Sequence, residues 1–160
     1  MMQLNNHEYF MRQAIKLARE NIQTGEGGPF GAIVVKDGEV IGRGANKVTS
    51  ENDPTAHAEV MAIRDACRTL NSFQLEGCVI YSSCEPCPMC LGAIYWARPE
   101  KLFFAASRQD AARAGFDDSY IYQQVSTDFD QRDISTEHLL QIEAVAVFDE
   151  WIVSEKKIPY

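Results

Sequence analysis

His57-Ala58-Glu59, followed 27 residues after that Glu by Pro86-Cys87-Pro88-Met89-Cys90, is the pattern that decides the fold and the chemistry of this chain. Each segment begins a predicted helix, and a predicted strand lies between the two helices. Cys87 and Cys90 are three residues apart, so both face the same side of a helix start. With His57 they predict three protein ligands for one Zn²⁺ ion per subunit, and a fourth position that stays open to water.

Glu59 lies two residues after His57 and is not counted among the ligands. A carboxylate beside zinc-bound water can take its proton and pass it to a leaving nitrogen. Zinc makes hydroxide available near neutral pH, and H-x-E combined with P-C-x-x-C is a signature of zinc deaminases. The pattern therefore predicts hydrolytic deamination by zinc-bound hydroxide, with Glu59 as the catalytic proton shuttle.

Other interpretations of the cysteines stay open at this point. A Cys-x-x-Cys pair is also found in redox proteins and in structural zinc sites, and Cys84 could complete a Cys₃His structural site. The joint occurrence of the two motifs, each at the start of a predicted helix, favours the catalytic site. Cys67 and Cys78 have apolar or small neighbours and are predicted to be packing residues.

The size and charge of the chain narrow the classes of function. It has 160 residues and a net charge of −8, from 15 basic and 23 acidic residues. The length predicts a single domain, and the acidic balance argues against nucleic acid and for a small-molecule substrate. Because the sequence has five cysteines and neither a membrane-length apolar run nor a secretory signal, we expect no membrane contact and a cytoplasmic location.

Hydrophobic periodicity predicts the order helix, strand, strand, helix, strand, helix, strand. The first helix is indicated by Phe10, Ala14, Leu17 and Ala18, and the second is expected to start at Asp53-Pro54 as N-cap and first residue. The predicted strands are residues 32–35, 40–46, 78–81 and 102–106, and the third helix is residues 88–97. This order predicts an α/β fold, a three-layer α-β-α sandwich with a mixed central sheet. The first two strands should form an antiparallel hairpin, and the two crossovers should produce parallel neighbours.

The last third of the chain has a weaker pattern. Residues 117–124 are predicted to be helical, and a terminal helix is expected around residues 147–153. Residues 134–147 fit a strand or a helix.

At the motif residues the sequence resembles the cytidine/deoxycytidylate deaminase superfamily, which implies the cytidine deaminase-like fold over nearly the whole chain. Within that superfamily it looks most similar to bacterial guanine deaminases. The closer likeness is carried by residues 27–32, Asn46, residues 52–59, residues 84–98 and residues 114–119. The stretch Gly115-Phe116-Asp117-Asp118 discriminates most, because it lies outside the zinc motif.

The resemblance implies a hydrolase acting on a cyclic amidine, which converts guanine to xanthine and ammonia in purine catabolism by attack at C2. By the same resemblance Phe30 packs on the purine, Asn46 hydrogen-bonds the base and Asp118 recognises guanine. A carboxylate can accept both the N1–H and the 2-amino donors of guanine. The backbone N–H of Ala58 and the carbonyl of Ser83 resemble contacts near the reaction centre.

The resemblance also implies a homodimer, in which a C-terminal segment of about residues 134–160 can be exchanged between subunits so that Tyr160 closes the partner's site. The tail departs from the family at Ile158-Pro159, and residues 131–147 also match it poorly. Three alternatives remain for the function: a deaminase of tRNA adenosine, a deaminase of cytosine or ammeline, or a non-enzymatic structural zinc module. A tRNA editor needs phosphate contacts, which the scarcity of basic clusters disfavours.

Overall fold

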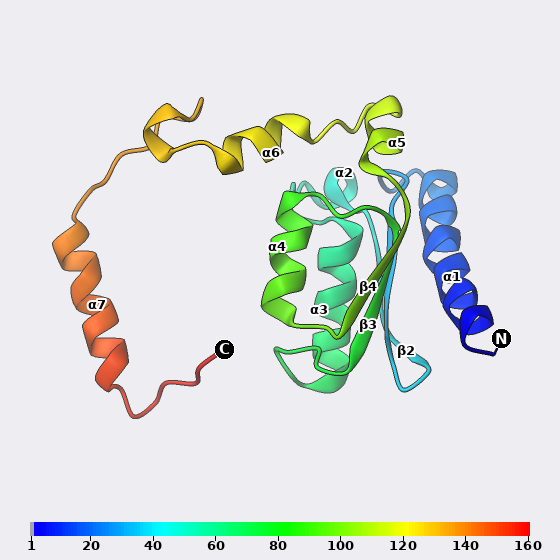
Figure 1. The fold of residues 1–160 in the computed structure, drawn as a ribbon, viewed down its shortest axis with the longest axis horizontal. Helices are drawn as coiled ribbons and strands as arrows, with labels where there is room; N and C mark the ends of the chain where they lie inside the picture. Colours follow the sequence, from blue (N-terminus) through cyan, green and yellow to red (C-terminus); the bar gives the residue numbers. More distant parts are fainter. Residues whose placement is uncertain (1) are drawn as a thin grey trace. The chain divides into compact units, whose positions relative to one another are not determined.

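The structure is a computed structural model that describes residues 2–160 (Figure 1). It divides into two compact units, with the boundary in the sequence between Ser119 and Tyr120. The helices of the first unit are α1 (Met2–Thr24), α2 (Val48–Glu51), α3 (Ala58–Leu70), α4 (Pro88–Ala97) and α5 (Arg108–Arg113). Its strands are β1 (Gly31–Lys36), β2 (Glu39–Ala45), β3 (Cys78–Cys84) and β4 (Lys101–Ala106).

The four strands form one mixed sheet in the order β2-β1-β3-β4. β1 is antiparallel to both β2 and β3, and β3 is parallel to β4. The predicted hairpin is confirmed, but only one of the two crossovers produces parallel neighbours. β2 and β3 run in the same direction with β1 between them. The reason is that residues 31–35 of β1 are buried on both faces, and such a strand belongs in the centre of a sheet.

Helices cover both faces of this sheet, which confirms the predicted three-layer α/β sandwich (Figure 1). On one face α1 packs against β1 and β3, around a core of Phe10, Ala14, Ile33, Val35 and Tyr81. On the other face α3 and α4 enclose a second core, which includes Cys78 and Ile80 of β3. Cys67 packs against that second core, so Cys67 and Cys78 are packing residues as predicted.

Two glycines of β2 allow α3 to lie directly against the sheet. A Cβ on Gly44 would overlap the carbonyl oxygen of Ala58 and the backbone nitrogen of Ala62, and one on Gly42 would overlap the next turn of the helix. The helix presents only alanines to these glycines, at positions 58, 62 and 66, all of them fully buried. This close packing fixes the depth of the first turn of α3, where the predicted zinc-binding histidine lies.

The start of α3 differs from the prediction. The helix begins at Ala58 with His57 as its N-cap, four residues after Pro54. The carboxylate of Asp53 accepts hydrogen bonds from the Thr55 backbone N–H at 2.8 Å and from its hydroxyl at 2.7 Å. Asp53 therefore stabilises a turn ahead of the helix, which is the other common use of an aspartate followed by proline.

The second unit contains α6 (Ser119–Ser126), a short 3-10 helix at Phe129–Gln131, and α7 (Gln141–Val153). The helix predicted at 117–124 corresponds to α6, and the one predicted around 147–153 is the second half of α7. Residues 134–147 contain no strand; the first part is irregular and the rest is helical. Tyr120–Tyr160 has no buried residue, and its most exposed apolar side chains include Leu139, Ile142, Phe148 and Val153.

Among residues 2–160, no helix is both long enough and apolar enough to cross a membrane.

Because β2 and α3 lie so close together, adding one methyl group at Gly44 should strongly lower the stability of the fold. Gly44→Ala should destabilise the fold by about 1–3 kcal/mol or more, because the new Cβ forces the backbone of α3 away from the sheet. The matched control is Gly92→Ala on the exposed side of α4, where a Cβ meets nothing within 4 Å. That change should be neutral or stabilising by up to about 1 kcal/mol. Thermal unfolding of both variants measures the difference, and equal melting temperatures would contradict the close packing.

Candidate active site

Most of the predicted site residues come together at one edge of the sheet, where β2 and β3 end and β1 begins. Asn46 directly follows the end of β2, and Phe30 directly precedes the start of β1. These two strand ends lie side by side, because Gly31 of β1 pairs with Ala45 of β2. His57 precedes α3, and Cys87 follows β3 by three residues. Segments far apart in the sequence are thus brought together because neighbouring strands deliver them to the same edge.

The three predicted zinc ligands form one cluster. His57 is the N-cap of α3, Cys87 is the N-cap of α4, and Cys90 lies in the first turn of α4. The Nδ1 atom of His57 lies 3.6 Å from the Sγ atom of Cys87 and 3.5 Å from that of Cys90. All three ligand atoms lie within 4.8 Å of one another. Both helices point their N-terminal ends at the cluster, and the positive ends of helix dipoles favour thiolates and other anions.

The donor set fits zinc and resembles a catalytic rather than a structural site. Two thiolates and one imidazole are ligands that Zn²⁺ prefers, and three protein ligands leave one position of a tetrahedron for water. In the described part of the chain the cluster has no fourth protein ligand. Cys84 is outside it: this side chain is buried, and its Sγ atom lies 3.7 Å from the carbonyl oxygen of Ser107. The Cys₃His structural site considered above is therefore not formed.

The two cysteines of the cluster shift each other's pKa in opposite directions. A hydrogen bond from the Cys90 thiol lowers the pKa of Cys87 to about 4, and the bond to His57 contributes in the same direction. The same interaction with Cys87 raises the pKa of Cys90. His57 in turn has a raised pKa, mainly because of its hydrogen bond with Cys87. The lowered pKa of Cys87 favours the thiolate, which is the form that binds a metal ion.

Glu59 lies one residue after the first residue of α3, and only 5% of its surface is exposed. The Ser82 hydroxyl donates a hydrogen bond of 3.0 Å to its Oε1 atom. Burial raises the pKa of this carboxyl, while the hydrogen bond from Ser82 acts in the opposite direction. A buried carboxyl with a raised pKa, beside side chains that could hold a metal ion, is suited to exchange a proton with a reacting group.

Asn46 is held in a fixed orientation by the backbone around it. Its Oδ1 atom accepts hydrogen bonds from the N–H groups of Gly28, at 3.2 Å, and Val48, at 3.3 Å. The side chain of Asn21, on α1, donates from Nδ2 to the carbonyl oxygens of Gly28 and Asn46, both at 2.8 Å. Because Oδ1 of Asn46 is engaged by the backbone, its Nδ2 group is the part that can donate to a ligand.

Sequence reasoning missed Asn21, which is 97% buried although it is polar. A signal was present, because Phe10, Ala14, Leu17 and Ala18 mark the apolar side of α1 and position 21 falls on the same side. A polar residue inside an apolar helix face needs a hydrogen-bonding partner.

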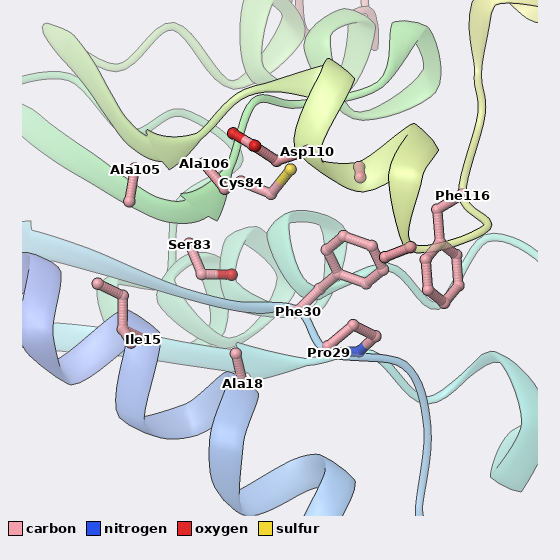
Figure 2. A pocket seen from close by; sticks show the side chains of 12 residues that line it. Ile15, Ala18, Pro29, Phe30, Ser83, Cys84, Ala105, Ala106, Asp110 and Phe116 are labelled. Atoms are coloured by element: carbon pink, nitrogen blue, oxygen red, sulfur yellow. The ribbon is translucent and has the colours of Figure 1, made fainter.

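Phe30 lies against a second aromatic ring and lines a pocket. Its ring centroid is 4.9 Å from that of Phe116, and the two rings meet edge to face. Figure 2 shows both rings at one end of a pocket of about 340 Å³, with Ile15 and Ala18 of α1 on one wall. Glu59 and the three metal-ligating residues do not line this pocket. The side chains that line this pocket are mostly apolar, and none of them belongs to the metal-ligating cluster. Among the residues whose side chains are predicted to contact the substrate, Phe30 is the one that lines the pocket.

Asp118 is half-buried and lies in the electrostatic field of the cluster. Desolvation raises the pKa of its carboxyl, and the negative charge of Cys87 adds to this effect. The neighbouring Asp117 has a different role, because its carboxylate accepts a 2.9 Å hydrogen bond from the Ser119 N–H at the start of α6. The local hydrogen bond to the start of α6 is thus made by Asp117.

The remaining predicted residues are placed as follows. Ala58 is fully buried as the first residue of α3, so its N–H belongs to the helix end that faces the metal cluster. Ser83 lies on β3, where its hydroxyl accepts a 3.0 Å hydrogen bond from the Gly31 N–H. Tyr160 belongs to the second unit and is 70% exposed.

Residues 4–106 match the family model of the cytidine and deoxycytidylate deaminase zinc-binding region. The chain belongs to this deaminase family. The matched residues include all four strands of the sheet and the cluster of His57, Cys87 and Cys90. Because the family model describes a zinc-binding region, the match also identifies zinc as the cofactor.

Two relatives and one solved structure extend the comparison. The guanine deaminase of Bacillus subtilis (strain 168) is 54% identical over 146 residues, which are 91% of this chain and 94% of the relative. An X-ray structure of guanine deaminase from Bacillus subtilis superposes with a TM-score of 0.94 at 52% identity, covering 96% of this chain and 98% of that one. A tRNA-specific adenosine deaminase of Aquifex aeolicus (strain VF5) is 48% identical over 99 residues, 62% of this chain and 65% of the relative.

The positions of the cysteines predict which of them are needed to bind zinc. Cys87→Ser and Cys90→Ser should each reduce bound zinc to well below one ion per chain, because each removes one of three ligands. Cys84→Ser is the matched control and should keep about one ion per chain, since its sulfur is outside the cluster. Elemental analysis of dialysed protein gives these ratios. Loss of zinc in Cys84→Ser would contradict the three-ligand site.

Proposed function

We propose that this protein is a zinc-dependent guanine deaminase, which hydrolyses guanine to xanthine and ammonia. The observation that carries the proposal is the buried carboxyl of Glu59 beside a metal cluster with only three protein ligands. That combination suits the attack of water on an amino-bearing ring carbon. The choice of guanine is supported by the similarity to guanine deaminase, which extends over 94% of that relative.

The chemistry follows from the chain's own side chains. His57, Cys87 and Cys90 would hold the zinc ion, which would lower the pKa of water enough to supply hydroxide near neutral pH. Glu59 takes the proton of the attacking water and returns it to the amino nitrogen, which leaves C2 as ammonia. Burial of the Glu59 carboxyl raises its pKa, and this favours uptake of the proton from the attacking water.

Recognition of the base is proposed for groups outside the zinc motif. The carboxylate of Asp118 accepts hydrogen bonds from the N1–H and 2-amino donors of guanine, a pair that adenine lacks. The Nδ2 group of Asn46 donates to an acceptor on the base, since its Oδ1 atom is held by backbone N–H groups. The ring of Phe30 packs on the purine. The N–H of Ala58, at the positive end of α3, contacts the reaction centre.

A tRNA adenosine deaminase is the main competing function, because such enzymes are also relatives of this chain. Their similarity covers 62% of the chain in the case of the Aquifex protein, against 91% for guanine deaminase. The net charge of −8 also disfavours a large polyanionic substrate. A free base is the better match for both observations.

We further propose that residues 1–160 act as one deaminase domain within a homodimer, and that residues 134–160 are exchanged so that Tyr160 enters the partner's site. Support comes from α7, where Ile142 is 88% exposed and Phe148 is 68% exposed, because apolar side chains of this size are normally covered. Light scattering of the full chain and of a chain shortened after residue 133 would separate a dimer built on this segment from one that is not.

A cytoplasmic location is proposed on the basis of the cysteines. All five are free thiols, and two of them, Cys87 and Cys90, must stay reduced to bind zinc.

The proposed reaction predicts ammonia release from guanine by the purified zinc protein. Glu59→Gln should lower kcat by about 100- to 10,000-fold while zinc stays bound, because the amide cannot carry the proton. Adenine, cytosine, cytidine, ammeline and a tRNA anticodon stem-loop are the comparison substrates, assayed at low and high salt. Salt-insensitive turnover of guanine supports the proposal. Release from cytidine or tRNA but not guanine would overturn the substrate, and full activity of Glu59→Gln would overturn the mechanism.

Asp118 provides a separate test of base recognition. Asp118→Asn should lower kcat/KM for guanine by about 10- to 100-fold, because one oxygen that accepts a hydrogen bond becomes a donor facing another donor. Asp117→Asn is the matched control and should keep kcat/KM, since the Asp117 carboxylate is engaged by Ser119. Steady-state kinetics with zinc analysis distinguishes them. Unchanged kcat/KM in Asp118→Asn would remove this residue from the site.

A further inference from the structure

Ser82 is the polar exception in a row of side chains that faces α3 and α4. Alternate residues of a strand point to the same face, so Cys78, Ile80 and Ser82 of β3 form one row. Cys78 and Ile80 are fully buried in the core against the alanines of α3. An apolar side chain would continue that core at position 82. The chain places a hydroxyl there instead, with only 2% of the residue exposed.

The partner of this hydroxyl is the Glu59 carboxyl. The Ser82 Oγ atom donates to Oε1 of Glu59 at 3.0 Å, and both residues are buried. The donor itself is held firmly, because Ser82 pairs with Ala32 on β1 and with Phe104 on β4 in the middle of the sheet. The acceptor sits in the first turn of α3, whose depth is set by the glycines of β2.

This arrangement distinguishes the two oxygens of one carboxyl. Oε1 is engaged by Ser82, and this hydrogen bond restrains the plane of the carboxyl and its side-chain rotamer. A glutamate side chain has several rotatable bonds. It transfers protons efficiently only when its carboxyl is held in an orientation that reaches the reacting groups.

We propose that Ser82 is a positioning residue for the deamination, whose hydroxyl holds Glu59 in the orientation needed to carry the proton between water and the leaving amino group. This inference rests on the proposed deaminase function and deepens it. Ser82 touches neither substrate nor metal; it acts through Glu59. Its removal should therefore lower the rate of the chemical step and leave the binding of zinc and of the base intact.

The test compares three variants of the full zinc-loaded chain. Ser82→Ala removes the hydroxyl, and Ser82→Thr keeps it on a residue that strands favour. Cys78→Ala is the matched control, because it shortens a buried side chain in the same row without a contact to Glu59. Each is assayed for kcat, KM, bound zinc and melting temperature, with whichever base of the panel the wild type deaminates fastest.

Ser82→Ala should lower kcat by about 10- to 100-fold, the effect of losing a hydrogen bond to a charged group, with KM within about twofold and zinc unchanged. Ser82→Thr should recover most of kcat, and Cys78→Ala should lower the melting temperature and keep kcat. Normal kcat in Ser82→Ala would overturn the positioning role. So would a loss of kcat in Ser82→Thr as large as in Ser82→Ala, or an equal loss in Cys78→Ala.

The wild-type measurement separates the two proposals. If the wild type deaminates another base and Ser82→Ala lowers that kcat, guanine is wrong and the positioning role stands. If the wild type deaminates guanine and Ser82→Ala is fully active, the proposed function stands and the positioning role is wrong. A wild type that holds zinc and deaminates no base overturns both.

Discussion

The shared direction of β2, β3 and β4 is the constraint on which the candidate site depends. α3 follows β2 and α4 follows β3, so both helices begin at the same edge of the sheet. His57 and Cys87 are the N-caps of those helices, so both lie at this edge, although α2 and two loops separate β2 from α3. β1 runs the other way and therefore starts at this edge, which adds Phe30 to the same neighbourhood. One property of the sheet thus assembles residues from four segments of the chain.

The zinc cluster and Glu59 could be predicted because their geometry is local. The three-residue spacing of Cys87 and Cys90, and the start of a helix after His57, are properties of a single turn. The order of the strands could not be predicted from the connections alone, since a crossover fixes the direction of a strand and not its neighbour. A clue was available in Ile33-Val34-Val35, an apolar run typical of a strand covered on both faces.

Contacts between distant segments were not predictable in the same way. Asn21 and Ser82 each act on a partner more than 20 residues away, and in the sequence they are simply polar residues on apolar faces. The helix boundary at Asp53 was misplaced because an aspartate can stabilise a turn or a helix start equally well. Residues 134–147 were ambiguous because α7 is apolar on several sides, so no single periodicity stands out.

The double anchoring of Asn46 has a thermodynamic consequence. Its side chain is fixed by two backbone N–H groups, and its carbonyl is held by Asn21, which is itself almost fully buried. A ligand that meets this amide does not have to order it, so little conformational entropy is lost on that side of the site. Asp118, by contrast, lies half-buried beyond α5, at the end of the first compact unit. In the proposed site the Asn46 amide would therefore be a preorganised wall, which favours tight binding of any planar base with an acceptor in the right place, and discrimination between bases would depend on Asp118.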